Sequence, residues 1–188
     1  MSSRGQPRED RATVPGTSIG DLDKDLVRAL VSRLRSTRGP VFTKADDTDV
    51  LQLVGVLSSD TEPAVTLAGL LALGRYPQQH FPQLDVTFVA FPDPSGEPLP
   101  DCARFLDNQS IDGPIPSMVI AAMAALRRNM TRRGIISGAG RMDRWEYPEE
   151  VLREVVTNAL MHRDYHPLAR GSQVRVELYP DRVEVTNP

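Results

Sequence analysis

The chain has 188 residues, of which 40% are hydrophobic, so it can form one domain and part of a second. Its net charge of −3 excludes a generally basic nucleic-acid binder, although it leaves room for a local basic patch. Cys102 is the only cysteine, which excludes an intramolecular disulfide and a cysteine-cluster metal site and fits a reducing cytoplasm.

The N-terminal part of the chain is predicted to be helical after a polar start. Residues 1–18 hold almost nothing to bury and are expected to form a disordered tail or a linker. Leucines at helical spacing predict a helix over residues 21–36, and residues 46–57 are predicted to form a second, shorter one. The apolar run Val65–Leu73 fits a buried strand or a buried helix, because periodicity does not distinguish them. A loop follows over residues 76–82.

Strands are predicted in the middle of the chain. Leu84–Phe91 is rich in β-branched and aromatic residues, and Cys102–Leu106 is predicted to be another strand after a long turn. Apolar residues along one face predict a helix over residues 117–132, which Gly134 ends. The stretch from 136 to 148 is predicted to be a loop or a short strand.

A helix and a hairpin are predicted at the end of the chain. Pro148, followed by two glutamates, indicates a helix start, and His166-Pro167 indicates its end. Residues 172–179 and 182–186 alternate apolar and polar side chains around a Pro-Asp turn, which predicts a β-hairpin. The predicted fold class is therefore α+β.

Glu154, Asn158 and His162 recur every four residues along the helix after Pro148, so they stack on one face. They border an apolar stripe, and a border row is expected to be half-buried. There a carboxylate could act as a base and an amide oxygen could hold a cation. The alternative is the polar side of an ordinary amphipathic helix. The stripe consists of Val151, Leu152, Val155, Val156, Ala159 and Leu160.

The stretch WEYPEEVLREVVTNALMHRDYHPLARGSQVRVELYPDRVEVTNP, residues 145–188, resembles the ATP-binding domain of a bacterial family of predicted transcriptional regulators, often labelled as related to ATP-dependent DNA helicases. In that family a Schlafen-type, Alba-like DNA-binding domain precedes an ATPase domain of the GHKL class, the superfamily of gyrase, Hsp90, histidine kinases and MutL. Leu67–Pro82 and two short motifs after it resemble the segment that links the two domains. The ATPase pattern falls here on Pro148, Glu149, Arg153-Glu154, Asn158-Ala159, His162-Arg163-Asp164-Tyr165, Asp181-Arg182 and Asn187-Pro188.

The resemblance implies a site for ATP and Mg²⁺. Glu154 would be the catalytic residue that activates the attacking water, and Asn158 would bind the Mg²⁺ that bridges the phosphates. Oxygen from one carboxamide and from phosphates suits this cation. His162 would face the phosphates or cap the helix end, and Arg163 would reach a phosphate. Asn187 stands where the class usually has an adenine-binding aspartate, which leaves adenine selectivity open.

The resemblance also implies a domain organisation. Residues 1–18 would be a tail, 19–140 a central α/β module, and 141–188 the N-terminal part of a GHKL-like ATP-binding domain. The family's glycine-rich boxes would lie beyond Pro188, and its DNA-binding domain upstream. The chain is therefore expected to be a fragment or natural truncation of a cytoplasmic ATP-binding transcriptional regulator. It would bind ATP weakly, be inactive as an ATPase by itself, and contact DNA through a domain that it lacks.

Two other readings of the HRD-containing stretch are weaker. A protein-kinase catalytic loop would need an asparagine where Ala169 stands, together with a glycine-rich loop and a strand lysine. A transition-metal site at His162, Asp164 and His166 would need a further ligand, and Pro167 is expected to break the helix there.

Two interaction surfaces are also suggested. The segment Leu126–Arg144 holds six arginines against one acid, and four of them, Arg127, Arg128, Arg132 and Arg133, could line a helix edge and reach nucleic-acid phosphates. The Ala- and Met-rich helix over 117–130 could be a core helix or a dimerisation scaffold, which is the alternative function. A homodimer is expected by analogy with GHKL proteins. No apolar run approaches the roughly 20 residues of a membrane span.

Overall fold

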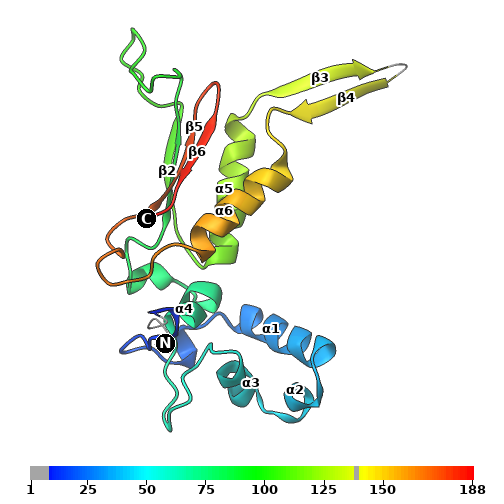
Figure 1. Cartoon of the computed structure of the whole chain (residues 1–188), viewed down its shortest axis with the longest axis vertical. Helices are drawn as coiled ribbons and strands as arrows, with labels where there is room; N and C mark the ends of the chain where they lie inside the picture. The colour runs from blue at the N-terminus through cyan, green and yellow to red at the C-terminus, as the bar shows by residue number, and fades with distance from the viewer. Residues whose placement is uncertain (1–8, 138–139) are drawn as a thin grey trace, which may run out of the picture. The chain divides into compact units, whose positions relative to one another are not determined.

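The computed structural model describes residues 9–137 and 140–188, and it divides the chain into two compact units, Met1–His80 and Phe81–Pro188. Figure 1 shows their elements. Helices and a four-stranded mixed sheet confirm the predicted α+β class. The boundary between the units falls inside the 19–140 module, and the assignment of 141–188 to a GHKL-like domain stays a prediction.

The first unit is helical. Its longest helix starts where the Asp23 carboxylate accepts two backbone N–H groups. Asp46 and Thr66 begin later helices, and the side chain of each accepts one backbone N–H group. The run that could have been strand or helix is a helix, α4, because the Thr66 side chain satisfies its first turn. The helices of the unit are α1 (Lys24–Thr37), α2 (Pro40–Lys44), α3 (Asp47–Leu53) and α4 (Leu67–Leu73), with 3₁₀ turns at Glu9–Arg11, Ile19–Asp21 and Pro77–Gln79.

Residues 9–18 are ordered and are held against the rest of this unit. Val14 is buried, and its N–H donates to the carbonyl of Val65 at 2.9 Å. The N–H of Leu67 donates to the carbonyl of Ala12 at 2.9 Å. The prediction of a disordered tail is therefore wrong for residues 9–18, because one apolar side chain and two backbone hydrogen bonds hold them. Residues 1–8 lie outside the described residues.

The second unit is built on a four-stranded sheet in the order β2-β1-β5-β6. Its central pair, β1 and β5, is parallel, and the two outer pairs are antiparallel. The predicted hairpin is confirmed as β5 and β6. The strands are β1 (Val86–Ala90), β2 (Asp107–Ile111), β5 (Val174–Leu178) and β6 (Val183–Thr186).

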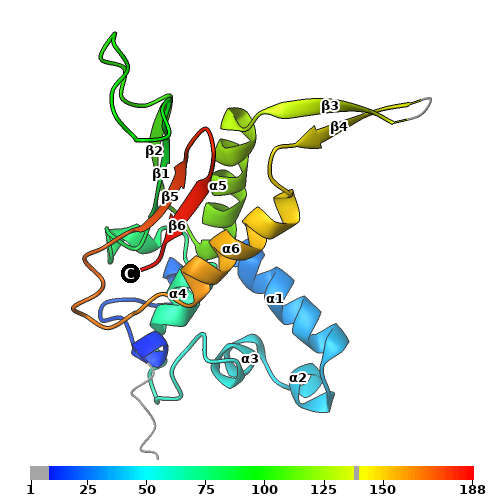
Figure 2. The same ribbon diagram turned by 45° about the horizontal axis from the view of Figure 1, so that its top comes forward.

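Helices α5 (Ile115–Asn129) and α6 (Glu149–Met161) pack against each other and against this sheet. Figure 1 and Figure 2 both place them on the same side of the sheet. The Ala- and Met-rich face of α5 is buried in the resulting core, so the core-helix reading of that face is the one that the structure supports. Its buried residues are Met118, Val119, Ala122, Met123, Ala125 and Leu126.

Several predicted strand and helix boundaries are wrong. Helix α6 ends at Met161, before the predicted end at His166-Pro167, and α3 ends at Leu53 rather than at residue 57. Cys102–Leu106 is not a strand, because Cys102 adopts a left-handed φ of 67° in a turn, where its N–H donates to the carbonyl of Leu99. Strand β2 begins only at Asp107. Helix α5 ends at Asn129, three residues before its predicted end at residue 132. The chain then forms a separate two-stranded ribbon, β3 (Arg132–Ser137) and β4 (Gly140–Trp145).

Candidate functional site

Helix α6 exposes the row of polar residues predicted from its spacing. Four of its residues are buried against the core, namely Leu152, Val156, Ala159 and Leu160. Val151 and Val155 remain 56% and 41% exposed, so the apolar stripe is narrower than expected. Glu154, Asn158 and His162 are consequently exposed and not half-buried, which corrects the expectation of a partly desolvated row.

Glu154 and Asn158 are brought together on this face. The Asn158 side-chain Nδ2 donates to Glu154 Oε1 at 3.0 Å. The two side chains therefore point toward one another across one helical turn. The Asn158 amide uses its nitrogen for this hydrogen bond, so its Oδ1 is not the atom bonded to Glu154. An amide oxygen is the type of atom that ligates Mg²⁺.

His162 stands at the C-terminal end of α6. Its backbone N–H donates to the carbonyl of Asn158 at 2.9 Å, and its side chain is exposed. The sequence left two roles open for His162, a contact with phosphate or a cap at the helix end. Its backbone occupies the cap position of α6. A contact between the imidazole and phosphate stays a prediction.

Arg163 turns inward and supports the loop after α6. Its Nη2 donates to the carbonyls of Ala169 and Ser172 at 3.3 and 2.6 Å, and the residue is only 5% exposed. Burial lowers the pKa of its guanidinium, while the nearby Tyr165, Asp85 and Asp164 side chains oppose that shift. In this position Arg163 stabilises the loop, so the phosphate contact implied by the resemblance would need the loop to rearrange.

Asn187 is exposed at the end of β6, and the backbone brings this end beside the end of α6. The N–H of Asp164 donates to the carbonyl of Pro188 at 3.1 Å. Helix α6 also packs against β6. The residues expected to contact magnesium and the base therefore come from neighbouring elements of one unit.

The three-ligand metal site at His162, Asp164 and His166 is not supported. Among residues 9–137 and 140–188, no three His, Cys, Asp or Glu side chains are grouped as metal ligands. The Asp164 carboxylate instead accepts the N–H of His166 at 2.8 Å, and His166 Nδ1 accepts the N–H of Leu168 at 3.3 Å. These contacts form a local turn before and after Pro167.

Sequence reasoning missed the buried carboxylate of Asp85. Its Oδ2 accepts the Ser110 hydroxyl at 2.5 Å, and the residue is 4% exposed. Within the described part of the chain, Oδ1 of Asp85 and both Nε and Nη1 of Arg163 are buried without a hydrogen-bond partner. The signal in the sequence was an acid directly before the apolar strand β1, where a charge must be compensated.

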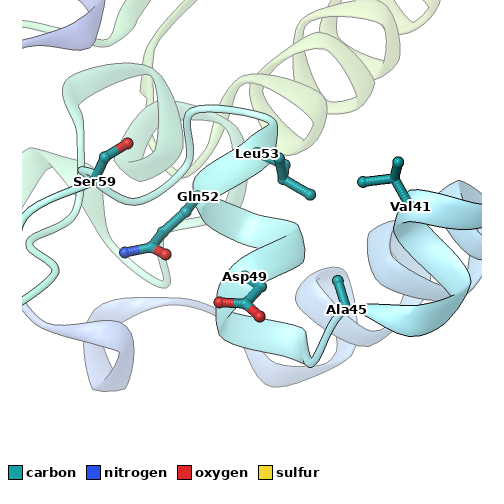
Figure 3. A pocket seen from close by; sticks show the side chains of 6 residues that line it. All are labelled: Val41, Ala45, Asp49, Gln52, Leu53 and Ser59. Atoms are coloured by element: carbon teal, nitrogen blue, oxygen red, sulfur yellow. The ribbon is translucent and has the colours of Figure 1, made fainter.

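A separate depression lies in the first unit. It has a volume of about 400 Å³ and is lined by Val41, Ala45, Asp49, Gln52, Leu53 and Ser59. Figure 3 shows these side chains around α2 and α3. None of the predicted site residues lines this depression.

Comparisons with known proteins give a family-model match over the first part of the chain and a likeness of fold over most of it. A sequence profile described as a domain of unknown function (DUF8451) matches residues 1–87. The crystal structure of the DIP2311 protein from Corynebacterium diphtheriae is similar, with a TM-score of 0.57 and 19% identity over 95% of this chain. The chain covers 27% of the length of that protein, and the likeness concerns the fold alone. A comparison with curated proteins gave no match.

In the described residues, no helix has both the length and the apolar character that crossing a membrane requires.

Proposed function

We propose that α6 presents Glu154 and Asn158 to a Mg²⁺–ATP complex, as part of a GHKL-type ATP-binding transcriptional regulator. The observation that carries the proposal is the hydrogen bond between these two side chains on an exposed helix face. A carboxylate and a carboxamide one turn apart are the groups that the ATPase pattern requires, and here they converge.

Each residue has a distinct role in this proposal. Asn158 would offer its amide oxygen as a hard ligand, and the bound Mg²⁺ would neutralise charge on the phosphates. Glu154 would hold the amide in place and accept a proton from water at its free carboxylate oxygen. Asn187, beside the end of α6, would contact the base through its amide.

The affinity of this face is expected to be low. Glu154, Asn158, His162 and Asn187 are all exposed, and exposed charges interact weakly because water and salt screen them. A dissociation constant on the order of 1 mM is therefore expected, which corresponds to about 4 kcal/mol of binding free energy.

Paramagnetic relaxation by Mn²⁺ tests the proposal directly, because Mn²⁺ replaces Mg²⁺ and broadens nearby NMR signals. Addition of Mn²⁺ and ATP together should broaden the Asn158 side-chain amide and the backbone amides at the end of α6. In the same titration, the backbone amides at the end of α6 should broaden at least tenfold less in Asn158→Ala than in the wild type. Glu154→Gln retains a partner for the amide and should leave binding within about twofold.

Two matched variants control for general effects on charge and amide content. Asn108→Ala and Glu97→Gln change the same chemical groups at exposed positions in the same unit, and neither should alter the broadening. Equal broadening in Asn158→Ala and the wild type would refute the proposed site. So would the absence of broadening in the wild type at ATP concentrations up to about tenfold the expected dissociation constant.

A further inference from the structure

A small cavity of the first unit is lined by residues of the turn before α1, of α4 and of the segment after α4. Its volume is about 170 Å³, which is room for roughly five or six waters at about 30 Å³ each. The lining combines an apolar wall with charged and polar side chains, namely Asp21, Leu70, Arg75, Tyr76, Gln79 and His80. A cavity of this size and composition suits a small polar molecule.

Backbone pairing places the two opposite charges of this cavity beside each other. Leu22 and Gly74 form an antiparallel bridge. Next to this bridge, the N–H of Arg75 donates to the carbonyl of Asp21 at 2.9 Å. Residues at opposite positions of an antiparallel pair project their side chains to the same face. The pairing therefore explains why an acid and an arginine that are far apart in the sequence line one cavity.

Ser18 holds the Asp21 carboxylate in a fixed position. The Ser18 backbone N–H donates to Asp21 Oδ2 at 2.7 Å, and its hydroxyl donates to the same oxygen at 3.2 Å. The backbone hydrogen bond is the main cause that lowers the pKa of Asp21. Burial opposes this shift, whereas the Ser18 hydroxyl, His80 and Arg75 lower the pKa further. Asp21 is therefore ionised at neutral pH, and its Oδ1 is not used by Ser18.

The charge of Arg75 is not engaged by a direct contact. The residue is exposed, and among the described residues its guanidinium makes neither a hydrogen bond nor an ion pair, only a longer-range attraction to Asp21. By contrast, Arg35 of α1 pairs with Asp47 at 2.9 Å and donates to two backbone carbonyls. The cavity thus offers a carboxylate oxygen and a guanidinium that are both open to a ligand.

We propose that this cavity binds a free α-amino acid with a small side chain. The Arg75 guanidinium binds the carboxylate of the ligand through two parallel hydrogen bonds, the geometry in which arginine recognises carboxylates. Asp21 Oδ1 accepts a hydrogen bond from the ammonium of the ligand. The side chain of the ligand lies toward Leu70, which is 1% exposed and provides the apolar wall.

The two charges of the cavity set its selectivity. A ligand that carries one charge only would leave either Asp21 or Arg75 without a partner, so the cavity favours a zwitterion over a simple anion or a simple amine. The volume of the cavity excludes large side chains. This inference concerns the first unit and does not depend on the nucleotide face proposed on α6.

NMR titrations of the wild-type chain with glycine, L-alanine and L-serine test this proposal. The backbone amides of Asp21, Leu70 and Arg75 should shift saturably, with a dissociation constant of about 1 mM or below for at least one of the three amino acids. Propionate lacks the ammonium and ethylamine lacks the carboxylate. Each of them should therefore bind at least tenfold more weakly than the amino acid that binds best.

Variants of the two charged residues assign the contacts. Arg75→Gln and Asp21→Asn should each weaken amino-acid binding at least tenfold. An asparagine side chain still accepts the Ser18 N–H, so Asp21→Asn should fold as the wild type does. Arg33→Gln and Asp60→Asn make the same changes at exposed positions of the first unit and should leave the affinity within about twofold.

Three results would each overturn the proposal. The first is the absence of a saturable shift in the wild type with all three amino acids at about 50 mM. The second is equal affinity for propionate, which would indicate a site for simple anions. The third is unchanged affinity in Arg75→Gln, whose exposed side chain makes no hydrogen bond among the described residues and whose unfolding temperature should match that of the wild type.

Discussion

The amide of Asn158 donates to the carboxylate of Glu154 at 3.0 Å, one turn apart on an exposed face of α6. This contact predicts the behaviour of Asn158→Asp. Two carboxylates four residues apart repel, so the variant should be less stable than the wild type by roughly 0.2–0.5 kcal/mol at pH 7. Urea unfolding at pH 7 and pH 3 measures this, because protonation should abolish the difference. The double variant Glu154→Gln/Asn158→Asp should regain the loss, and a variant as stable as the wild type at pH 7 would contradict the expected geometry.

Adjacent valines on α6 differ in burial and should differ in their contribution to stability. Val156 is fully buried, whereas Val155 is 41% exposed. Val156→Ala removes two buried methyl equivalents and leaves a cavity, so a loss of about 2 kcal/mol is expected. Val155→Ala should stay within about 0.5 kcal/mol of the wild type. Chemical unfolding of both proteins distinguishes them, and equal losses would show that α6 packs differently.

Arg163 should tolerate no replacement, including lysine. Its guanidinium donates to two carbonyls from inside the unit, and a lysine ammonium lacks the planar fork that reaches both. Arg163→Lys should therefore destabilise the protein by about 2 kcal/mol, since each buried acceptor left without a donor is costly. Arg153→Lys, an exposed position on α6, is the matched control and should be nearly neutral. A neutral Arg163→Lys would mean that the loop does not depend on the fork.

Arg127 and Glu149 connect α5 to the start of α6 and give stability a dependence on pH. The hydrogen bond from Arg127 lowers the pKa of the Glu149 carboxyl below its usual value. A carboxyl with a lowered folded-state pKa stabilises the fold above its unfolded pKa of about 4.3, and this contribution is lost as the pH falls through the folded value.

Urea unfolding of the wild type and Glu149→Gln from pH 7 to pH 3 measures that contribution. The difference in unfolding free energy should be constant above about pH 5 and vanish at the acid end. Glu150→Gln, at the adjacent exposed carboxylate, should show a smaller difference. A gap between wild type and Glu149→Gln that persists at pH 3 would assign the effect to something other than this ion pair.

Gly69 in α4 lies against the backbone of the first unit. A Cβ at this position would stand 2.3 Å from the carbonyl oxygen of Val56, so one of the two segments must move. Gly69→Ala should therefore destabilise the first unit by at least about 2 kcal/mol. Gly39→Ala meets no atom within 4 Å and serves as control, with an expected change of a few tenths of a kcal/mol. Thermal unfolding followed by circular dichroism measures both.

Much of the local structure was predictable because local patterns decide it. The leucines at every fourth position of α1, the proline and glutamates at the start of α6, and the alternation in β5 and β6 each contain their own signal. The Cys102–Leu106 strand was wrong because a left-handed turn residue is invisible to alternation. The open choice at Val65–Leu73 was resolved only by the Thr66 cap.

The spacing of Glu154, Asn158 and His162 determined by itself that they share one side of α6, since helix geometry fixes which residues stack. The tertiary structure decided that this side faces solvent, that Arg163 turns inward, and that Glu149 compensates Arg127. These outcomes depend on which distant segments cover a helix. Asp85, directly before β1, for example, opposes the lowering of the pKa of Arg163, although the two residues are far apart in the sequence. Burial and charge pairing are long-range properties, so a local pattern does not contain them.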